Sequence, residues 1–82
     1  MNEAFASQAL LFQNHFRLDD RKLNSYGGAL AFGHPYGATG GILISRLLNR
    51  INKLEKPCLG IATLCIAGGM GISILLGNRW FR

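Results

Sequence analysis

The chain has 82 residues, which allows one small domain or part of a larger one. Its residues are 49% hydrophobic, too many for a disordered chain, and its two cysteines exclude a disulfide scaffold. The formal net charge of +5 favours anionic partners, among which phosphates fit as well as nucleic acid.

The first segment with a regular pattern covers residues 2–16 and predicts a helix. Asn2 is a favourable N-cap, and Glu3 suits the positive end of the helix dipole. Apolar residues recur at helical spacing and form one face, made of Phe5, Ala9, Phe12 and Phe16. Residues 18–22 are mostly charged and are interpreted as a connector.

The middle of the chain predicts a short extended element and then a second helix. Residues 28–32 favour a short strand or an extended loop, and Pro35 keeps the residue before it out of the helical region. An apolar stripe predicts a helix over residues 38–54, and it consists of Leu43, Leu47, Ile51 and Leu54, widened by Ile44 and Leu48. The opposite side of this helix is expected to face solvent and carries Arg46, Arg50 and Lys53.

The last part of the chain, residues 57–78, carries no charge and therefore needs a test for a membrane helix. Over residues 59–77 the mean hydropathy is about 2 per residue, which is high enough to suggest a membrane span. However, three central glycines would each cost a helix about 1 kcal/mol relative to alanine. A glycine turn between two buried strands, 59–66 and 72–76, explains the same residues and is the favoured interpretation. Two helices cannot readily cover both faces of such a sheet, which indicates a partner domain.

Three polar residues close to glycines are candidates for chemistry. His34 lies in a glycine-lined loop before a helix N-terminus, whose dipole favours a neutral imidazole that can act as a base. Cys65 ends an apolar strand and meets a Gly-Gly-x-Gly turn, whose backbone N–H groups could stabilise an anion. Simpler roles stay open: a loop hydrogen-bonder for His34, a core residue for Cys65 and a helix cap for Asn2. No metal site and no nucleic-acid binding are expected.

Three stretches of the chain, in this order, resemble the C-terminal part of thiolases over residues 2–77. The stretches are Asn2-Glu3-Ala4-Phe5-Ala6, then Asn24-x-x-Gly27-Gly28-Ala29-Leu30-Ala31-x-Gly33-His34-Pro35-x-Gly37-Ala38-Thr39-Gly40, then Ala62-Thr63-Leu64-Cys65-Ile66-x-Gly68-Gly69-Met70-Gly71. The resemblance implies an α/β, thiolase-like fold with a mixed sheet. The chain would be part of the C-terminal domain, with the order helix, short strand, helix and two sheet strands.

The thiolase resemblance also implies an acyl transfer between coenzyme A thioesters, with no cofactor. Thiolases condense two acetyl-CoA to acetoacetyl-CoA, or cleave 3-ketoacyl-CoA in the reverse direction. By this resemblance, His34 would activate the nucleophilic cysteine and donate to an oxyanion hole in which Asn2 holds a water. Cys65 would be the acid/base that takes the α-proton, and the backbone N–H of its loop, at Ala67, would serve the other oxyanion hole.

The chain departs from the thiolase pattern in its missing parts and at one residue. The family's nucleophilic cysteine and its CoA-binding loop have no counterpart in residues 1–82, and Cys58 lacks the nucleophile's motif. Ala67 stands where the family usually has glycine, which would be costly at a positive φ.

The sequence as a whole predicts a partial C-terminal thiolase domain that is inactive alone. The complete protein is expected to be a cytoplasmic homo-oligomer of fatty acid or mevalonate metabolism that binds neither membrane nor nucleic acid. Alternatives are a non-catalytic module built on the thiolase scaffold and a small membrane protein.

Overall fold

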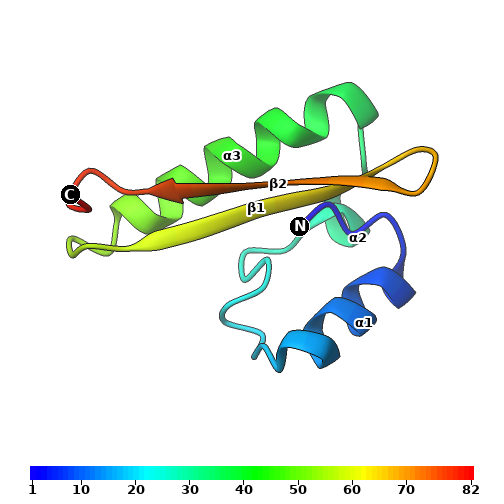
Figure 1. The fold of residues 1–82 in the computed structure, drawn as a ribbon, viewed down its shortest axis with the longest axis horizontal. Coiled ribbons are helices and arrows are strands. Elements are labelled where there is room, and N and C mark those ends of the chain that lie inside the picture. The colour runs from blue at the N-terminus through cyan, green and yellow to red at the C-terminus, as the bar shows by residue number, and fades with distance from the viewer.

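The computed structural model describes residues 1–82 and contains three helices and one β-hairpin (Figure 1). The elements are, in chain order, α1 (Ala6–Phe16), α2 (Ala29–Phe32), α3 (Tyr36–Asn52), β1 (Leu59–Ile66) and β2 (Met70–Gly77). In Figure 1, α3 runs along one side of the hairpin, whereas α1 and the connector that follows it lie on the other side. The predicted α/β class is confirmed.

The two strands pair antiparallel from Leu59↔Gly77 to Ile66↔Met70. The first strand has the bounds predicted from the sequence, and the second is longer than expected at both ends. These are the only two strands, so the expected mixed sheet does not occur in this chain. In the turn, Gly68 and Gly69 take positive φ values of 78° and 73°, while Ala67 does not. Alanine therefore fits its position without backbone strain.

Helix α3 packs on the face of the hairpin that carries Gly60 and Ala62. A Cβ atom at Gly60 would lie 2.6 Å from Cδ1 of Leu47, so the missing side chain lets the helix approach the strand closely. Ile51 of α3 and Ala62 are only 4% and 5% exposed, and with Met1 they are the buried hydrophobic residues. The apolar stripe of the second helix thus finds a partner, and the helix starts two residues earlier than predicted.

The opposite face of the hairpin is largely uncovered. Ile61 and Leu75 are paired across the strands and are 61% and 60% exposed. Helix α1 contributes no buried residue, although its apolar spacing predicted a core-facing side. The chain therefore leaves an apolar sheet face open to its surroundings.

The start of α1 differs from the prediction because Asn2 is not its N-cap. The helix begins at Ala6, and the cap position is held by Phe5 without a side-chain hydrogen bond. Asn2 is completely buried, and its amide is used in a contact with the distant Cys65. Glu3 also lies outside the helix and has a positive φ of 44°.

The predicted short strand at residues 28–32 is wrong, because Ala29–Phe32 form a single helical turn, α2. The carboxylate of Glu3 accepts the backbone N–H of Leu30 at 3.2 Å, which satisfies a donor at the start of this turn. That carboxylate occupies the space where Gly28 would carry a side chain. A tertiary contact with Glu3 therefore stabilises the helical turn.

The basic side of α3 is not simply solvated, as the sequence suggested. The Arg46 guanidinium donates to the carbonyl oxygens of Tyr26 and Gly27 at 3.3 and 3.4 Å. The Arg50 guanidinium donates to the carbonyl oxygen of Arg21 at 3.0 Å and lies 4.8 Å from the ring centroid of Tyr26. These arginines attach the connector between α1 and α2 to the rest of the fold.

No helix of the structure has both the length and the apolar character needed to span a bilayer. The uncharged segment 57–78, which suggested a membrane alternative, forms the hairpin instead. Its last residue, Asn78, is buried and closes the base of the hairpin with four side-chain hydrogen bonds.

Candidate functional site

The structure brings Asn2 and Cys65 into direct contact. Nδ2 of Asn2 donates to Sγ of Cys65 at 3.2 Å, across a separation of 63 residues. Asn2 is buried, whereas Cys65 lies near the exposed end of β1. A buried amide thus presents an N–H donor to a thiol that solutes can reach, and such a donor stabilises a thiolate.

The segment that carries Asn2 is held in place by Asn24. The amide nitrogen of Asn24 donates to the carbonyl oxygen of Met1 at 2.9 Å and to Oε2 of Glu3 at 2.7 Å. Its amide oxygen accepts from the amino group of Met1 at 2.8 Å. Burial lowers the pKa of that amino group from its usual value, and nearby Glu3 partly opposes this effect. Asn24 therefore ties down both residues that flank Asn2.

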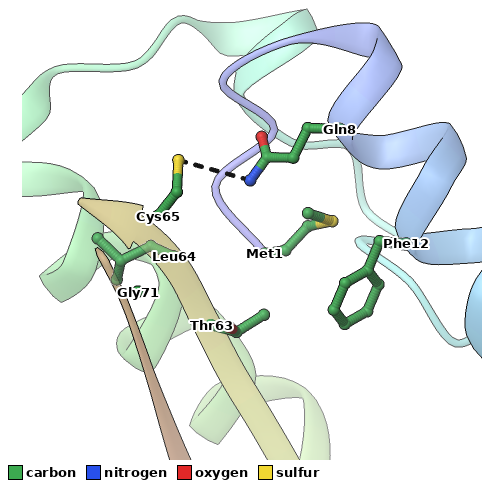
Figure 2. Close-up of a pocket in the computed structure, with 7 residues that line it drawn as sticks. All are labelled: Met1, Gln8, Phe12, Thr63, Leu64, Cys65 and Gly71. Atoms are coloured by element: carbon green, nitrogen blue, oxygen red, sulfur yellow. Dashed lines mark hydrogen bonds between the residues drawn. The ribbon is translucent and has the colours of Figure 1, made fainter. Parts of the chain in front are cut away.

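Gln8 of α1 is a further member of the site that the sequence analysis did not single out. Its Nε2 donates to Oδ1 of Asn2 at 2.8 Å and lies 3.6 Å from Sγ of Cys65 (Figure 2). The only signal in the sequence is that Gln8 and Phe12 are one helical turn apart and so share a face of α1. That face meets the site.

A small open cavity of about 190 Å³ lies beside the Cys65 thiol (Figure 2). Its lining comes from the N-terminal segment, α1 and both strands, and consists of Met1, Gln8, Phe12, Thr63, Leu64, Cys65 and Gly71. Pockets for drug-sized ligands usually measure about 300–1,000 Å³, so this cavity suits a small group rather than a whole coenzyme. The reactive part of a larger substrate could enter beside the sulfur.

His34 is fixed by a different neighbour, Thr39. Its Nδ1 lies 2.6 Å from Oγ1 of Thr39, which is a buried residue of α3, and its ring contacts that of Tyr36. This bond orients the imidazole and leaves Nε2 free for another group. No hydrogen bond joins His34 to Asn2 or Cys65. Thr39 belongs to the glycine-rich motif of residues 24–40, but nothing in that pattern indicates its hydrogen bond to His34.

Ala67 occupies the first position of the hairpin turn, two residues after Cys65. Its backbone N–H is not used in any of the hydrogen bonds of the turns and loops. An unpaired backbone N–H is a donor to which an anionic oxygen can bind. No group of three His, Cys, Asp or Glu side chains could hold a metal ion.

Comparison with known proteins gives consistent results over almost the whole chain. The family model "Thiolase, C-terminal domain" matches residues 1–78. The chain is 45% identical over 75 residues to the acetyl-CoA acetyltransferase of Escherichia coli, covering 92% of this chain and 19% of that protein. It is 45% identical over 71 residues to the human peroxisomal 3-ketoacyl-CoA thiolase, covering 87% of this chain and 17% of that protein. 

A plant relative shows a similar identity and coverage. The peroxisomal 3-ketoacyl-CoA thiolase 1 of Arabidopsis thaliana is 46% identical over 72 residues, covering 87% of this chain and 16% of that protein. The chain thus spans about a fifth or less of the length of the curated relatives it matches. No solved structure gives a significant match.

Proposed function

This chain belongs to the thiolase family, as a C-terminal domain segment, and we propose that within the complete protein it supplies the acid/base half of an acyl-CoA C-acyltransferase site. The observation that carries this proposal is the 3.2 Å contact from Nδ2 of Asn2 to Sγ of Cys65. The relatives carry names of enzymes that act on acetyl-CoA or 3-ketoacyl-CoA. The substrates of this protein are therefore proposed to be coenzyme A thioesters, with no further cofactor.

In the proposed condensation, the Cys65 thiolate takes a proton from the α-carbon of an acetyl thioester. The electron pair of that C–H bond moves into an enolate whose negative charge lies on the carbonyl oxygen. The unpaired N–H of Ala67 is placed in the turn after Cys65 and would donate to this oxygen. The donors of Asn2 and Gln8 stabilise the thiolate that the first step needs.

The enolate carbon then attacks the carbonyl carbon of an acyl group held as a thioester on a nucleophilic cysteine elsewhere in the complete protein. A C–C bond forms, and the C–S bond to that cysteine breaks, so the cysteine leaves as a thiolate. We propose that His34 and Asn2 stabilise the oxyanion of that thioester. Thr39 orients the His34 ring and leaves Nε2 free to donate or accept a proton. One hydrogen of the Asn2 amide points to Cys65, and we propose that the second binds a single enclosed water of this oxyanion hole, since Asn2 has no surface exposed to bulk solvent.

The setting of the complete protein is also proposed. Both cysteines of this chain are free thiols, which fits the reducing cytoplasm, although two of the relatives carry peroxisomal names. The uncovered hairpin face around Ile61 and Leu75 supports a further protein surface against it, either the rest of the enzyme or a second subunit.

The test uses the complete protein that contains this chain. Thiolytic cleavage of acetoacetyl-CoA is followed for Cys65→Ser and His34→Ala, with Cys58→Ser as a matched control because Cys58 lies just before β1, at the end of the strand away from Cys65. Loss of a general acid/base typically lowers the rate by about 10²–10⁴-fold, so kcat should fall by this factor in the first two variants only. Full activity of Cys65→Ser would refute the assignment, and a parent protein without activity would favour a scaffold role.

A further inference from the structure

A series of hydrogen bonds fixes which end of the Asn2 amide faces Cys65. It starts at the backbone N–H of Ala4, which can only donate, and which donates to Oε1 of Gln8 at 2.7 Å. The other end of the Gln8 amide must then be its NH₂ group, which donates to Oδ1 of Asn2 at 2.8 Å. Only Nδ2 of Asn2 is left to meet the sulfur.

We propose that Gln8 is a positioning residue that sets the protonation preference of Cys65 through the Asn2 amide. In the observed orientation, Nδ2 of Asn2 donates a hydrogen bond to Sγ of Cys65, which favours the thiolate. If the amide were reversed, its oxygen would face the sulfur and favour a protonated S–H that donates to it. This inference rests on the proposed function, since it assigns the base of that reaction a device that keeps it ready.

The burial of Asn2 makes its orientation a property of the protein rather than of solvent. Asn2 has no surface exposed to bulk solvent, so solvent cannot compensate an amide turned the wrong way. Gln8 also acts directly, because its Nε2 points at the sulfur from the α1 side of the cavity (Figure 2). Removing Gln8 would thus release the amide of Asn2 and delete a second donor at the same time.

The test measures the alkylation rate of Cys65 by iodoacetamide at pH 7, without substrate, in the complete protein that contains this chain. Site-resolved mass spectrometry follows Cys65 and, as an internal reference, Cys58. Gln8→Glu keeps the acceptor for Ala4 but loses the donor to Asn2, so the amide should reverse. Gln8→Met removes both ends of the relay without adding charge. The matched control is Gln13→Glu, since Gln13 lies on the same helix and its side chain forms a hydrogen bond only with Asp20.

We expect alkylation of Cys65 to slow by about tenfold in Gln8→Glu and about threefold in Gln8→Met, because hydrogen bonds to charged groups are stronger than neutral ones. The rate at Cys58, and both rates in Gln13→Glu, should not change. Nuclear magnetic resonance gives a second test of the amide orientation. The side-chain amide resonances of Asn2 should shift when Cys65→Ala is introduced into the parent protein. The same substitution should shift them far less in the Gln8→Glu variant.

Unchanged Cys65 alkylation in both Gln8 variants would overturn the proposal. Loss of helical circular dichroism in both would assign Gln8 a structural role only, and would overturn it as well. The proposed function fails separately, because it depends on the activity of the complete enzyme. Slow alkylation of Cys65 in Gln8→Met together with an inactive parent protein would keep the positioning role and reject the thiolase reaction.

Discussion

Replacing Asn78 by alanine should destabilise this chain more than any other single change of a polar side chain. Its Nδ2 donates to the carbonyl oxygens of Ile51 at 2.8 Å and Lys56 at 2.7 Å. Its Oδ1 accepts the backbone N–H groups of Cys58 at 3.2 Å and Phe81 at 3.1 Å. Asn78 is 4% exposed, so water replaces these partners poorly.

The four bonds of Asn78 set the size of the effect. A hydrogen bond contributes about 1 kcal/mol net, and the N–H of Phe81 and the carbonyl oxygen of Ile51 keep backbone partners in the alanine variant, so the variant should lose about 2–3 kcal/mol. Small domains have a free energy of unfolding of about 5 kcal/mol. The variant should therefore lose about half of its stability.

Urea unfolding followed by circular dichroism measures this loss. For a domain of this size the slope is about 1 kcal/mol per molar urea, so the midpoint should fall by about 2–3 M. Asn52→Ala is the matched control, because Asn52 makes one exposed bond, to the N–H of Arg79 at 3.1 Å, and should cost about 0.5–1 kcal/mol. A midpoint for Asn78→Ala as close to the parent as that of the control would refute the reasoning.

The charge of the side chain gives a second test at the same position. In Asn78→Asp, a carboxylate oxygen would replace the donor that faces the carbonyls of Ile51 and Lys56. Burial and those carbonyls should raise the pKa of the new carboxyl group in the folded state above its unfolded value. A folded state that binds the proton more tightly gains stability as pH falls, so this variant should be more stable at pH 4 than at pH 7.

Three further changes should have distinct outcomes. Gly60→Val should lower the free energy of unfolding by about 1–3 kcal/mol, since even its Cβ would press against Leu47. Gly41 has open space around it, so Gly41→Ala should stabilise α3 by up to about 1 kcal/mol. Urea midpoints measure both effects. Light scattering at micromolar concentration should show that the parent chain self-associates through the open hairpin face. The variant Leu75→Lys places a charge beside Ile61 and should be monomeric. A monomeric parent chain would contradict this expectation. The 82-residue chain alone should form no acetyl-CoA from acetoacetyl-CoA and CoA, because it lacks the nucleophile for a covalent thioester, and turnover would contradict that assignment.

Local patterns predicted the parts of the fold that depend on neighbouring residues. The strand Leu59–Ile66 was predicted to the residue, because a continuous apolar run there lies between Lys56-Pro57 and a glycine cluster. The α3 stripe is predicted for a similar reason, since its helical spacing extends over about three turns, from Leu43 to Leu54. Three motifs in order also predicted the family, which the family match confirms.

Contacts between distant residues explain what the sequence did not reveal. Asn2 has every local property of a helix cap, but its burial against Cys65 depends on a strand that follows much later. Residues 28–32 are too few to show a period, and the Glu3 carboxylate decides their helical turn. For Gln8 the sequence offers only its place on the Phe12 face of α1, and for Asn78 at the hairpin base it offers no signal, since polar residues usually face solvent.

The contact between Asn2 and Cys65 also constrains the order of events in folding. Asn2 is synthesised early and Cys65 late in this segment, and their contact closes a loop that spans a sequence separation of 63 residues. Closing so large a ring costs chain entropy that only the packed hairpin and helices can offset. The donor at the sulfur should therefore be among the last features to form and the first to be lost on partial opening. Native-state exchange of the Asn2 side-chain amide would then report the integrity of the whole segment, and a nascent chain that stops before the hairpin would carry no such contact.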